Sequence, residues 1–337
     1  MKIAMIGGTG LIGSQAALEL IERGHQVKTI SLPPIPTGSH LPSQMEITLG
    51  NYMDMSDDDL RTFFQGCEGF VFAAGVDERI EGPAPIYDFF KKYNIDSLER
   101  LLGLAKECGI QHAVVCGSYF TYFVNSRPEV DLVGPHQYIR SRVDQQKLAL
   151  SYADEHFDVA VLELPYIYGT QPGRKPVWVF LAEMLLATPE ATYYPRGGTT
   201  MVTVKQVGQA IAGALERNRG GHAYPIGYYN MTWVEMLTIC QQALGLDKPI
   251  MTIPDDAYLT SSEQLMQQRR AEGFDPGLDM VKFADLQLSN MFIDKELGCV
   301  PLGVEEDDIV AAITDSMQLS QQIIAGQVQD TIDMKAE

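Results

Sequence analysis

The chain opens with Ile3-Ala4-Met5-Ile6-Gly7-Gly8-Thr9-Gly10-Leu11-Ile12-Gly13, an apolar run that breaks into glycines. The apolar run predicts a buried strand, and the pattern from Leu11 to Glu22 predicts a helix that stops before Gly24. A glycine turn between a strand and a helix is the context that a dinucleotide fingerprint requires. The stretch therefore predicts a nucleotide site, for which the alternative is a plain tight turn.

The glycines have distinct physical roles in such a turn. Gly7 allows a backbone conformation that most residues avoid, and Gly10 lets backbone amides approach a pyrophosphate at the positive end of the helix. Gly13 lets the helix pack close to the strand. The spacing satisfies both Gly8-x-Gly10-x-x-Gly13 and Gly7-x-x-Gly10-x-x-Gly13.

Composition limits the classes of protein that remain. The 337 residues are 45% hydrophobic, which predicts a globular chain of one large or two moderate domains. A net charge of −19 argues against nucleic acid or an anionic membrane as a partner. The scattered cysteines and histidines lack metal-ligand spacing, so we expect no metal and the reduced thiols of a cytoplasmic protein. The glycine turn comes too early for a signal peptide, and no apolar run is long enough for a membrane span.

Further short strands alternate with helical patterns along the chain. Strands are predicted at residues 25–31, 46–49, 69–74, 113–116, 159–164 and 222–226. This alternation predicts an α/β fold with a doubly wound parallel sheet. Ligands of such sheets lie beyond the carboxyl ends of the strands, so residues 7–13, 73–75, 118 and 165–168 should line one crevice.

The predicted helices and domain boundaries follow from the same patterns. Besides 11–22, helices are predicted after Ser56 and at about 85–108, 137–156, 175–187, 204–217 and 232–244, with a loose terminal helix at 318–337. Residues 258–286 receive no assignment. We expect a nucleotide-binding domain at 1–169, to which 199–227 return, a substrate-binding region at 170–198 and 228–315, and a tail at 316–337.

The end of the second predicted strand bears on the choice of cofactor. An Asp or Glu there would bind the ribose hydroxyls of NAD, and an Arg would favour the additional phosphate of NADP. This chain has Ser31 followed by Leu32. The sequence therefore leaves the preference between NAD and NADP open.

The chain resembles the extended short-chain dehydrogenase/reductase family, also called the NAD-dependent epimerase/dehydratase family, over roughly its first 310 residues. Besides the glycine turn, the resemblance rests on Ala73-Ala74-Gly75, Tyr93-Asn94, Gly117-Ser118 with Tyr122, Tyr138-Ile139-Arg140-Ser141-Arg142, Pro165-Tyr166-Ile167-Tyr168-Gly169, Met201-Val202-Thr203-Val204 and Phe292 to Gly298. It implies a Rossmann-type sheet with a smaller C-terminal α/β substrate-binding region.

The resemblance also implies catalytic roles. Tyr138 matches the family's general acid/base, and Ser118 matches the hydroxyl that shares the substrate oxygen. Arg142 stands where the family has a lysine that binds the nicotinamide ribose and lowers the pKa of the tyrosine. Four residues is one helical turn, so both side chains share a face. Arginine keeps the charge but cannot release a proton. The alternative for Tyr138 and Arg142 is that they belong to an ordinary amphipathic helix without a catalytic role.

Other positions carry over from the family less directly. Asn51 and Tyr52 match residues that contact the adenine, Asn94 matches an asparagine that orders the site, and Pro165 and Tyr166 match residues beside the nicotinamide amide. The full set of cofactor-binding candidates is Gly7, Gly10, Leu11, Ile12, Gly13, Ser31, Asn51, Tyr52, Ala73, Ala74, Gly75, Asn94, Tyr138, Arg142, Pro165 and Tyr166.

Two residues are candidates for substrate binding. Arg79 follows the fourth strand and would meet an anionic substrate group, unless it is a solvated charge, and Tyr122 lies close after Ser118. Glu163 stands where many members have arginine, which indicates altered ion pairing. The literal Tyr-x-x-x-Lys of Tyr87 and Lys91 precedes the fifth strand, so we assign it to helix surface or packing.

The pattern as a whole predicts an NAD- or NADP-dependent oxidoreductase or epimerase that acts on a small hydroxyl or carbonyl substrate. A regulatory or redox-sensing protein that binds the dinucleotide without turnover is an alternative, favoured by Arg142, Ser31 and Glu163. A structural subunit with a vestigial site is a third. Family members often dimerise through the helices that match 85–108 and 138–156, so we expect a homodimer.

Overall fold

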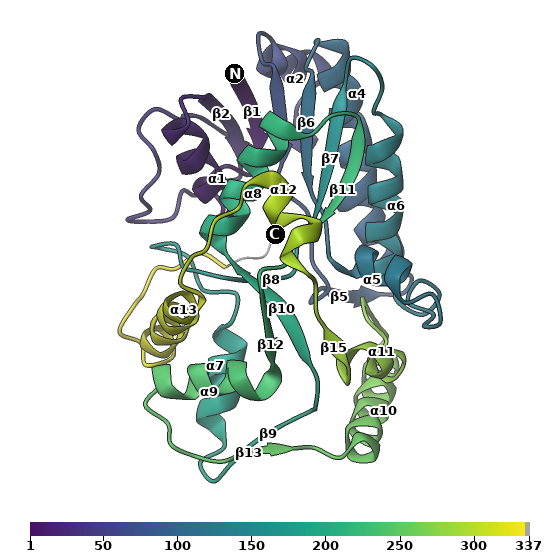
Figure 1. Cartoon of the computed structure of the whole chain (residues 1–337), viewed down its shortest axis with the longest axis vertical. Coiled ribbons are helices and arrows are strands. Elements are labelled where there is room, and N and C mark those ends of the chain that lie inside the picture. The colour runs from purple at the N-terminus through teal and green to yellow at the C-terminus, as the bar shows by residue number, and fades with distance from the viewer. Residues whose placement is uncertain (334–337) are drawn as a thin grey trace.

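A seven-stranded parallel sheet forms the upper half of the computed structural model, which describes residues 1–333 (Figure 1). Its strand order is β11-β7-β6-β4-β1-β2-β3. The strands are β1 (Lys2–Ile6), β2 (Gln26–Ser31), β3 (Glu46–Leu49), β4 (Gly69–Phe72), β6 (His112–Cys116), β7 (Asp158–Glu163) and β11 (Gly221–Pro225). The predicted parallel sheet is confirmed, and each predicted strand forms within two residues of its expected bounds.

Helices cover both faces of this sheet. On one face Ile3 and Met5 of β1 pack with α1 (Leu11–Glu22) and α8 (Val204–Arg217). On the other, Ala4 and Ile6 pack with α2 (Asp57–Phe64), α4 (Ser97–Glu107) and α6 (Gln137–Ser151). Both faces of β1 are apolar because both are buried, which is why its sequence is an unbroken apolar run. The doubly wound arrangement is thereby confirmed.

The predicted helix at 85–108 is present but changes its winding. It consists of α3 (Ile86–Phe90), a π-helical segment (Lys91–Asp96) and α4. A π-helical turn leaves backbone carbonyls out of the regular α-helical bonding and often occurs at functional sites. Here the segment carries Asn94, which is completely buried.

Other helices differ from expectation mainly at their ends. Ser56 caps α2 in a reciprocal capping box with Asp59, as its position predicts. The helix predicted at 137–156 ends at Ser151. The helix predicted at 175–187 begins only at Val179, because the Lys175 amide bonds to the Ile332 carbonyl and the chain turns at Pro176. The unassigned 258–286 region forms parts of α10 (Asp255–Ala271) and α11 (Met280–Gln287).

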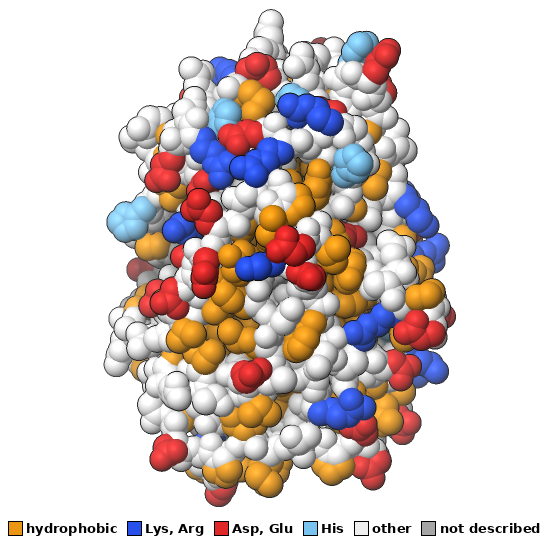
Figure 2. All heavy atoms as spheres, in the orientation of Figure 1, with side chains coloured by type: hydrophobic (Ala, Val, Ile, Leu, Met, Phe, Trp, Pro, Cys, Tyr) orange, Lys and Arg blue, Asp and Glu red, His pale blue; other side chains and the backbone are white. Residues whose placement is uncertain are grey.

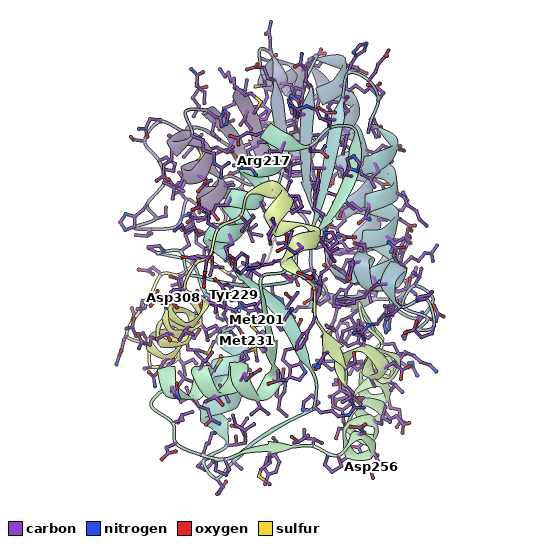
Figure 3. The ribbon with its side chains drawn as sticks, in the orientation of Figure 1. Met201, Arg217, Tyr229, Met231, Asp256 and Asp308 are labelled. Carbon is purple, nitrogen blue, oxygen red and sulfur yellow. The ribbon has the colours of Figure 1, made fainter. Side chains whose placement is uncertain are left out.

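A second group of elements lies below the central sheet in Figure 1. Its sheet has the order β12-β10-β15, and β8 also pairs with β10. Figure 3 labels Met201 on β10 and Tyr229 and Met231 on β12, which run antiparallel. The strands are β8 (Tyr166–Tyr168), β10 (Gly198–Thr203), β12 (Tyr229–Thr232) and β15 (Asn290–Met291), and the main helices are α7 (Val179–Ala187), α9 (Trp233–Ala243) and α13 (Ile309–Ile324). Of the stretch 199–227, α8 and β11 lie with the central sheet and β10 does not.

Short elements complete the chain. They are β5 (Glu81–Pro83), which pairs with β14 (Phe274–Pro276), β9 (Thr192–Tyr194), which pairs with β13 (Ile250–Thr252), α5 (Phe120–Ser126), α12 (Cys299–Leu302) and the 3₁₀ turns Tyr52–Asp54 and Lys295–Leu297. The predicted terminal helix at 318–337 is wrong in its bounds: the helix is α13, which starts earlier because Ile309, Ile313 and Met317 form its buried face. Residues 325–333 are not helical, and 334–337 lie outside the described residues.

The surface carries charges of both signs. Figure 2 shows acidic and basic side chains interspersed over one face, with apolar side chains gathered across its middle. Within residues 1–333, no helix combines the length and apolar character needed to cross a membrane. The same residues contain no group of three or more His, Cys, Asp or Glu side chains placed to hold a metal ion.

Candidate active site

A cavity of about 380 Å³ lies at the carboxyl ends of the central strands. Its wall brings together five segments that are far apart in the sequence: the glycine turn, the loop after β4, the loop after β6, the start of α6, and residues 164–180. Of the predicted site residues, it includes Gly10, Leu11, Ile12, Gly13, Ala73, Ala74, Gly75, Arg79, Ser118, Tyr138, Arg142, Pro165 and Tyr166.

The glycine turn is shaped to receive an anionic group. Gly7 has a φ of 90°, and Gly10 caps α1 without a side-chain hydrogen bond. A Cβ on Gly13 would lie 2.1 Å from the Gly7 carbonyl oxygen, so only glycine allows α1 to sit this close to β1. The first amides of α1 therefore face the cavity without a side-chain acceptor, which fits a dinucleotide pyrophosphate.

Tyr138 and Arg142 lie on the same face of α6 and are both buried. Arg142 Nε donates to the Tyr138 hydroxyl oxygen at 3.1 Å. Its Nη1 donates to Gln145 Oε1 at 2.8 Å, and its Nη2 donates to the Val76 carbonyl oxygen at 3.0 Å. Each nitrogen of the guanidinium thus has an acceptor, and the group is held rigidly beside the tyrosine.

Asn94 completes this network from the π-helical segment. Its Oδ1 accepts from the Val76 amide at 2.9 Å, and its Nδ2 donates to the Val76 carbonyl oxygen at 3.1 Å. Gln145 Nε2 donates to the Asn94 carbonyl oxygen at 2.7 Å. Asn94 therefore fixes the loop after β4 against α6, so its contacts position other residues.

The pKa of Tyr138 is raised above its ordinary value. Burial of the hydroxyl is the main cause, and the charges of Glu78 and Asp77 act in the same direction. The Arg142 guanidinium opposes this shift, as does the nearby Ser118 hydroxyl. Tyr138 is consequently protonated at neutral pH and is suited to donate a proton.

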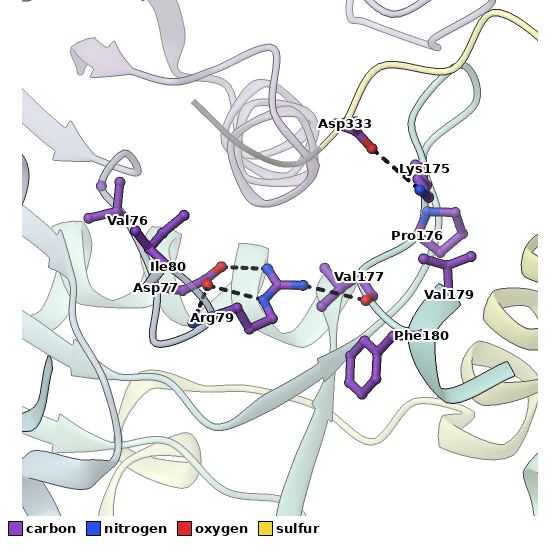
Figure 4. Close-up of a pocket in the computed structure, with 11 residues that line it drawn as sticks. Val76, Asp77, Arg79, Ile80, Lys175, Pro176, Val177, Val179, Phe180 and Asp333 are labelled. Carbon is purple, nitrogen blue, oxygen red and sulfur yellow. Dashed lines mark hydrogen bonds and ion pairs between the residues drawn. The ribbon is translucent and has the colours of Figure 1, made fainter. Parts of the chain in front are cut away.

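Acidic residues line the cavity beside Arg79. Burial disfavours the Asp77 carboxylate, but hydrogen bonds from Arg79 prevail and lower its pKa. Burial raises the pKa of Glu78, and the neighbouring Asp77 charge adds to the shift. Arg79 binds both carboxylate oxygens of Asp77, one of them from Nε at 3.0 Å, and reaches the Val177 carbonyl (Figure 4). Its guanidinium is thus engaged within the protein.

Six predicted site residues lie outside the cavity wall. Gly7 forms the turn beneath it, and Asn94 acts through Val76 as described. The buried Ser31 hydroxyl accepts from the Thr9 amide at 3.2 Å, so it braces the glycine turn.

The remaining three make contacts within the fold. Asn51 Oδ1 accepts from the Met53 amide at 3.1 Å and caps a 3₁₀ turn. The Tyr52 ring packs edge-on against Phe72, with ring centroids 6.3 Å apart. The Tyr122 ring packs against Phe123.

The cavity wall contains residues that sequence reasoning missed, chiefly Glu78, Tyr119, Arg174, Trp178 and Phe180. Tyr119 directly follows Ser118, so its proximity was a usable signal. Residues 174–180 reach the cavity because the loop after β8 passes it, and no local sequence pattern predicts the path of this loop. The literal Tyr-x-x-x-Lys pair lies elsewhere: Tyr87 donates to Asp144 at 2.6 Å, and Lys91 pairs with Asp96.

The sequence of the chain matches a known family over most of its length. A model of the NAD dependent epimerase/dehydratase family matches residues 3–227. The chain therefore belongs to this family, as its motifs predicted.

One curated relative spans nearly the whole chain. The "Putative dihydroflavonol 4-reductase" of Synechocystis sp. is 22% identical over 337 residues, covering 94% of this chain and 93% of the relative.

Solved structures confirm the fold over the whole length. The crystal structure of gox2253 is 20% identical, with a TM-score of 0.72, and covers 97% of this chain and 99% of its own. A UDP-glucuronic acid 4-epimerase from Bacillus cereus, solved with UDP-glucuronic acid and NAD, is 14% identical with a TM-score of 0.68, covering 96% of this chain and 100% of its own. At these identities the likeness establishes the Rossmann-type fold alone.

Proposed function

We propose that the protein is an NAD(P)-dependent reductase in which Tyr138 donates a proton to a substrate carbonyl oxygen. The observation that carries the proposal is the Tyr138 hydroxyl, bonded to Arg142 in the same cavity as the glycine turn and Ser118. The family to which the chain belongs is NAD-dependent. The proposal favours reduction over the reverse oxidation because a protonated tyrosine is an acid.

The roles of the site residues follow from their positions. The glycine turn and the first amides of α1 would hold the pyrophosphate, and Pro165 and Tyr166 would lie beside the nicotinamide. Bound NAD(P)H supplies hydride to a carbonyl carbon. The hydroxyls of Ser118 and Tyr138 hydrogen-bond the carbonyl oxygen, which takes the Tyr138 proton. Arg142 stabilises the tyrosinate that remains, since its Nε already donates to that oxygen.

The cavity wall favours a substrate with an apolar body. Trp178 packs against Tyr166 with ring centroids 4.7 Å apart, and Tyr119 and Phe120 lie beside Ser118. Exposed Phe180 adds an aromatic ring to the wall. Aromatic surfaces bury large apolar area, so we expect an aromatic or otherwise hydrophobic ketone or aldehyde.

The first test is cofactor binding followed by turnover. Trp178 lines the cavity, so titration with NADH and NADPH should quench tryptophan fluorescence. A screen of hydrophobic carbonyl compounds would then compare the parent with Tyr138→Phe. Loss of the proton donor should slow reduction by about 10²- to 10⁴-fold with little change in cofactor affinity. Tyr87→Phe is the matched control, because the partly buried Tyr87 also contacts α6, through Asp144, but lies outside the cavity. Full activity in Tyr138→Phe would refute the mechanism.

A regulatory or redox-sensing protein with little turnover is the second candidate function. It is favoured by Arg142, whose nitrogens already donate to Tyr138, Gln145 and Val76, whereas a lysine could also relay a proton. Arg142→Lys separates the two proposals. A faster rate of reduction in Arg142→Lys than in the parent would favour the regulatory proposal, in which the site is adapted for binding. A slower rate would favour the reductase proposal, in which catalysis uses the guanidinium.

Assembly and location remain proposals as well. We infer a homodimer through α3–α4 and α6, the two helices that the resemblance assigns to an interface, and light scattering that gives the mass of a monomer would contradict it. We also propose a cytoplasmic, reducing environment, because the five cysteines are free in the described structure.

A further inference from the structure

The loop after β8 crosses the glycine turn. Gln171 Nε2 donates to the Thr9 carbonyl oxygen at 3.0 Å and to Ser14 Oγ at 3.2 Å. Arg174 Nη2 donates to the same Thr9 carbonyl at 3.4 Å. These contacts place a guanidinium directly beside the turn that opens α1.

The C-terminal residues hold this loop from its other side. The Ile332 amide donates to the Gly173 carbonyl, and the Lys175 amide donates to the Ile332 carbonyl, both at 2.9 Å. Lys175 also pairs with Asp333 at 3.6 Å (Figure 4). Arg174 therefore lies on a segment fixed on both sides, which limits the entropy lost when it binds a ligand.

The charge of Arg174 is not neutralised within the described part of the chain. Its Nε donates to Gln171 Oε1 at 2.8 Å, and its Nη atoms reach only the carbonyl oxygens of Thr9 and Asp333. No carboxylate of residues 1–333 lies within 4.0 Å of its nitrogens, and burial lowers its pKa. A partly buried cation without an anion is costly, so its place in the cavity wall indicates an anionic ligand.

The loop after β2 supplies no cation that could bind the dinucleotide. Residues 32–45 contain no Lys, Arg, Asp or Glu, and Ser31 is occupied by the Thr9 amide. The loop after β2 therefore cannot supply a charge to the adenosine side of a dinucleotide. Arg174 directly follows Gly173, which packs against Pro36 and Thr37 of this loop, and Arg174 lines the cavity together with Gly10–Gly13.

We propose that Arg174 binds the pyrophosphate of the dinucleotide together with the first amides of α1. Its Nη groups would donate to the phosphate oxygens in exchange for the long 3.4 Å bonds to the two carbonyls. The inference rests on the proposed function, because it requires that the cavity binds NAD(P).

The test is the dissociation constants of NADH, NADPH and ADP-ribose for the parent, Arg174→Gln and Arg174→Lys. A charge-assisted bond is worth enough that Arg174→Gln should weaken all three ligands by about 10- to 100-fold. Arg174→Lys keeps the positive charge but loses the planar pair of N–H donors, so its affinities should lie between those of the parent and of Arg174→Gln. Lys175→Gln is the matched control: its ion pair is with Asp333, and it should change the affinities by about 5-fold or less.

Other results would overturn the inference or separate it from the proposed function. Unchanged affinities in folded Arg174→Gln would overturn the inference while leaving the proposed function intact. A loss confined to NADPH would overturn the pyrophosphate assignment in favour of the ribose 2′-phosphate. If the parent binds neither dinucleotide, the inference and the proposed function both fail. Should Arg174→Gln unfold, Arg174→Lys carries the test: affinities weaker than the parent's that still fall with added salt would support the inference, and unchanged affinities with no dependence on salt would overturn it.

Discussion

His136 directly precedes α6 and should make the stability of the protein fall on mild acidification. Its ring is fully buried, and its Nδ1 accepts from the Asp279 amide at 3.1 Å. Its Nε2 has no protein partner among the described residues. Protonation would place a second N–H at Nδ1, facing the amide that already donates there. Burial accordingly lowers the pKa to about 4 from 6.5, although the charges of Asp279 and Asp131 oppose the shift.

The size of the effect follows from these two pKa values. Between pH 7 and pH 5 the unfolded chain protonates this histidine and the folded chain does not, so stability is lost as the pH falls. Linkage with pKa values of about 4 folded and 6.5 unfolded gives a loss of about 2 kcal/mol over this interval. The Tyr138 amide bonds to the same segment, at the Gly277 carbonyl, so this segment also contacts the first turn of α6.

Urea unfolding of the parent and His136→Asn at pH 7 and pH 5 measures this contribution. Asparagine keeps an acceptor for the Asp279 amide but does not titrate. The difference in unfolding free energy between the two pH values should be about 2 kcal/mol smaller in His136→Asn than in the parent. The exposed His222 supplies a control, since His222→Asn should retain the parent's difference. The same difference in His136→Asn and in the parent would refute the reasoning.

Two further changes test the turn and the buried carboxylate. Gly13→Ala places a methyl group 2.1 Å from the Gly7 carbonyl oxygen, so α1 must move. We expect the free energy of unfolding, measured with a chemical denaturant, to fall by about 1–3 kcal/mol and NADH to bind more weakly. Unchanged values for both would contradict the packing argument. Glu163 is buried, accepts from the Thr121 hydroxyl at 2.6 Å, and has its pKa raised by burial, so the folded state binds its proton more tightly. The parent should therefore lose stability relative to Glu163→Gln as the pH rises from 4 to 8, and a relative gain would show that the carboxylate is stabilised in its charged form.

Much of the fold could be predicted because its signals are local. The strands of the central sheet are short apolar runs between turns, and α8 begins and ends where its pattern predicts. The prediction for the terminal helix starts too late, because the helix begins at Ile309, before the glutamine-rich stretch on which the prediction rests. The π-helical segment could not be read from the sequence, since its winding depends on the bonds of Asn94 to Val76 and Gln145.

The sequence by itself determined the strand, glycine turn and helix at residues 3–22, the parallel sheet, and the pairing of Tyr138 with Arg142 on one helical face. Each of these depends on residues that are neighbours in the chain or one helical turn apart. Only the tertiary structure decided that Arg142 is bound by Val76 and that Arg174 faces Thr9, contacts that join residues 66 and 165 positions apart. Such contacts depend on where loops cross the ends of the sheet, because the packing of the whole chain sets those paths and no local pattern encodes them.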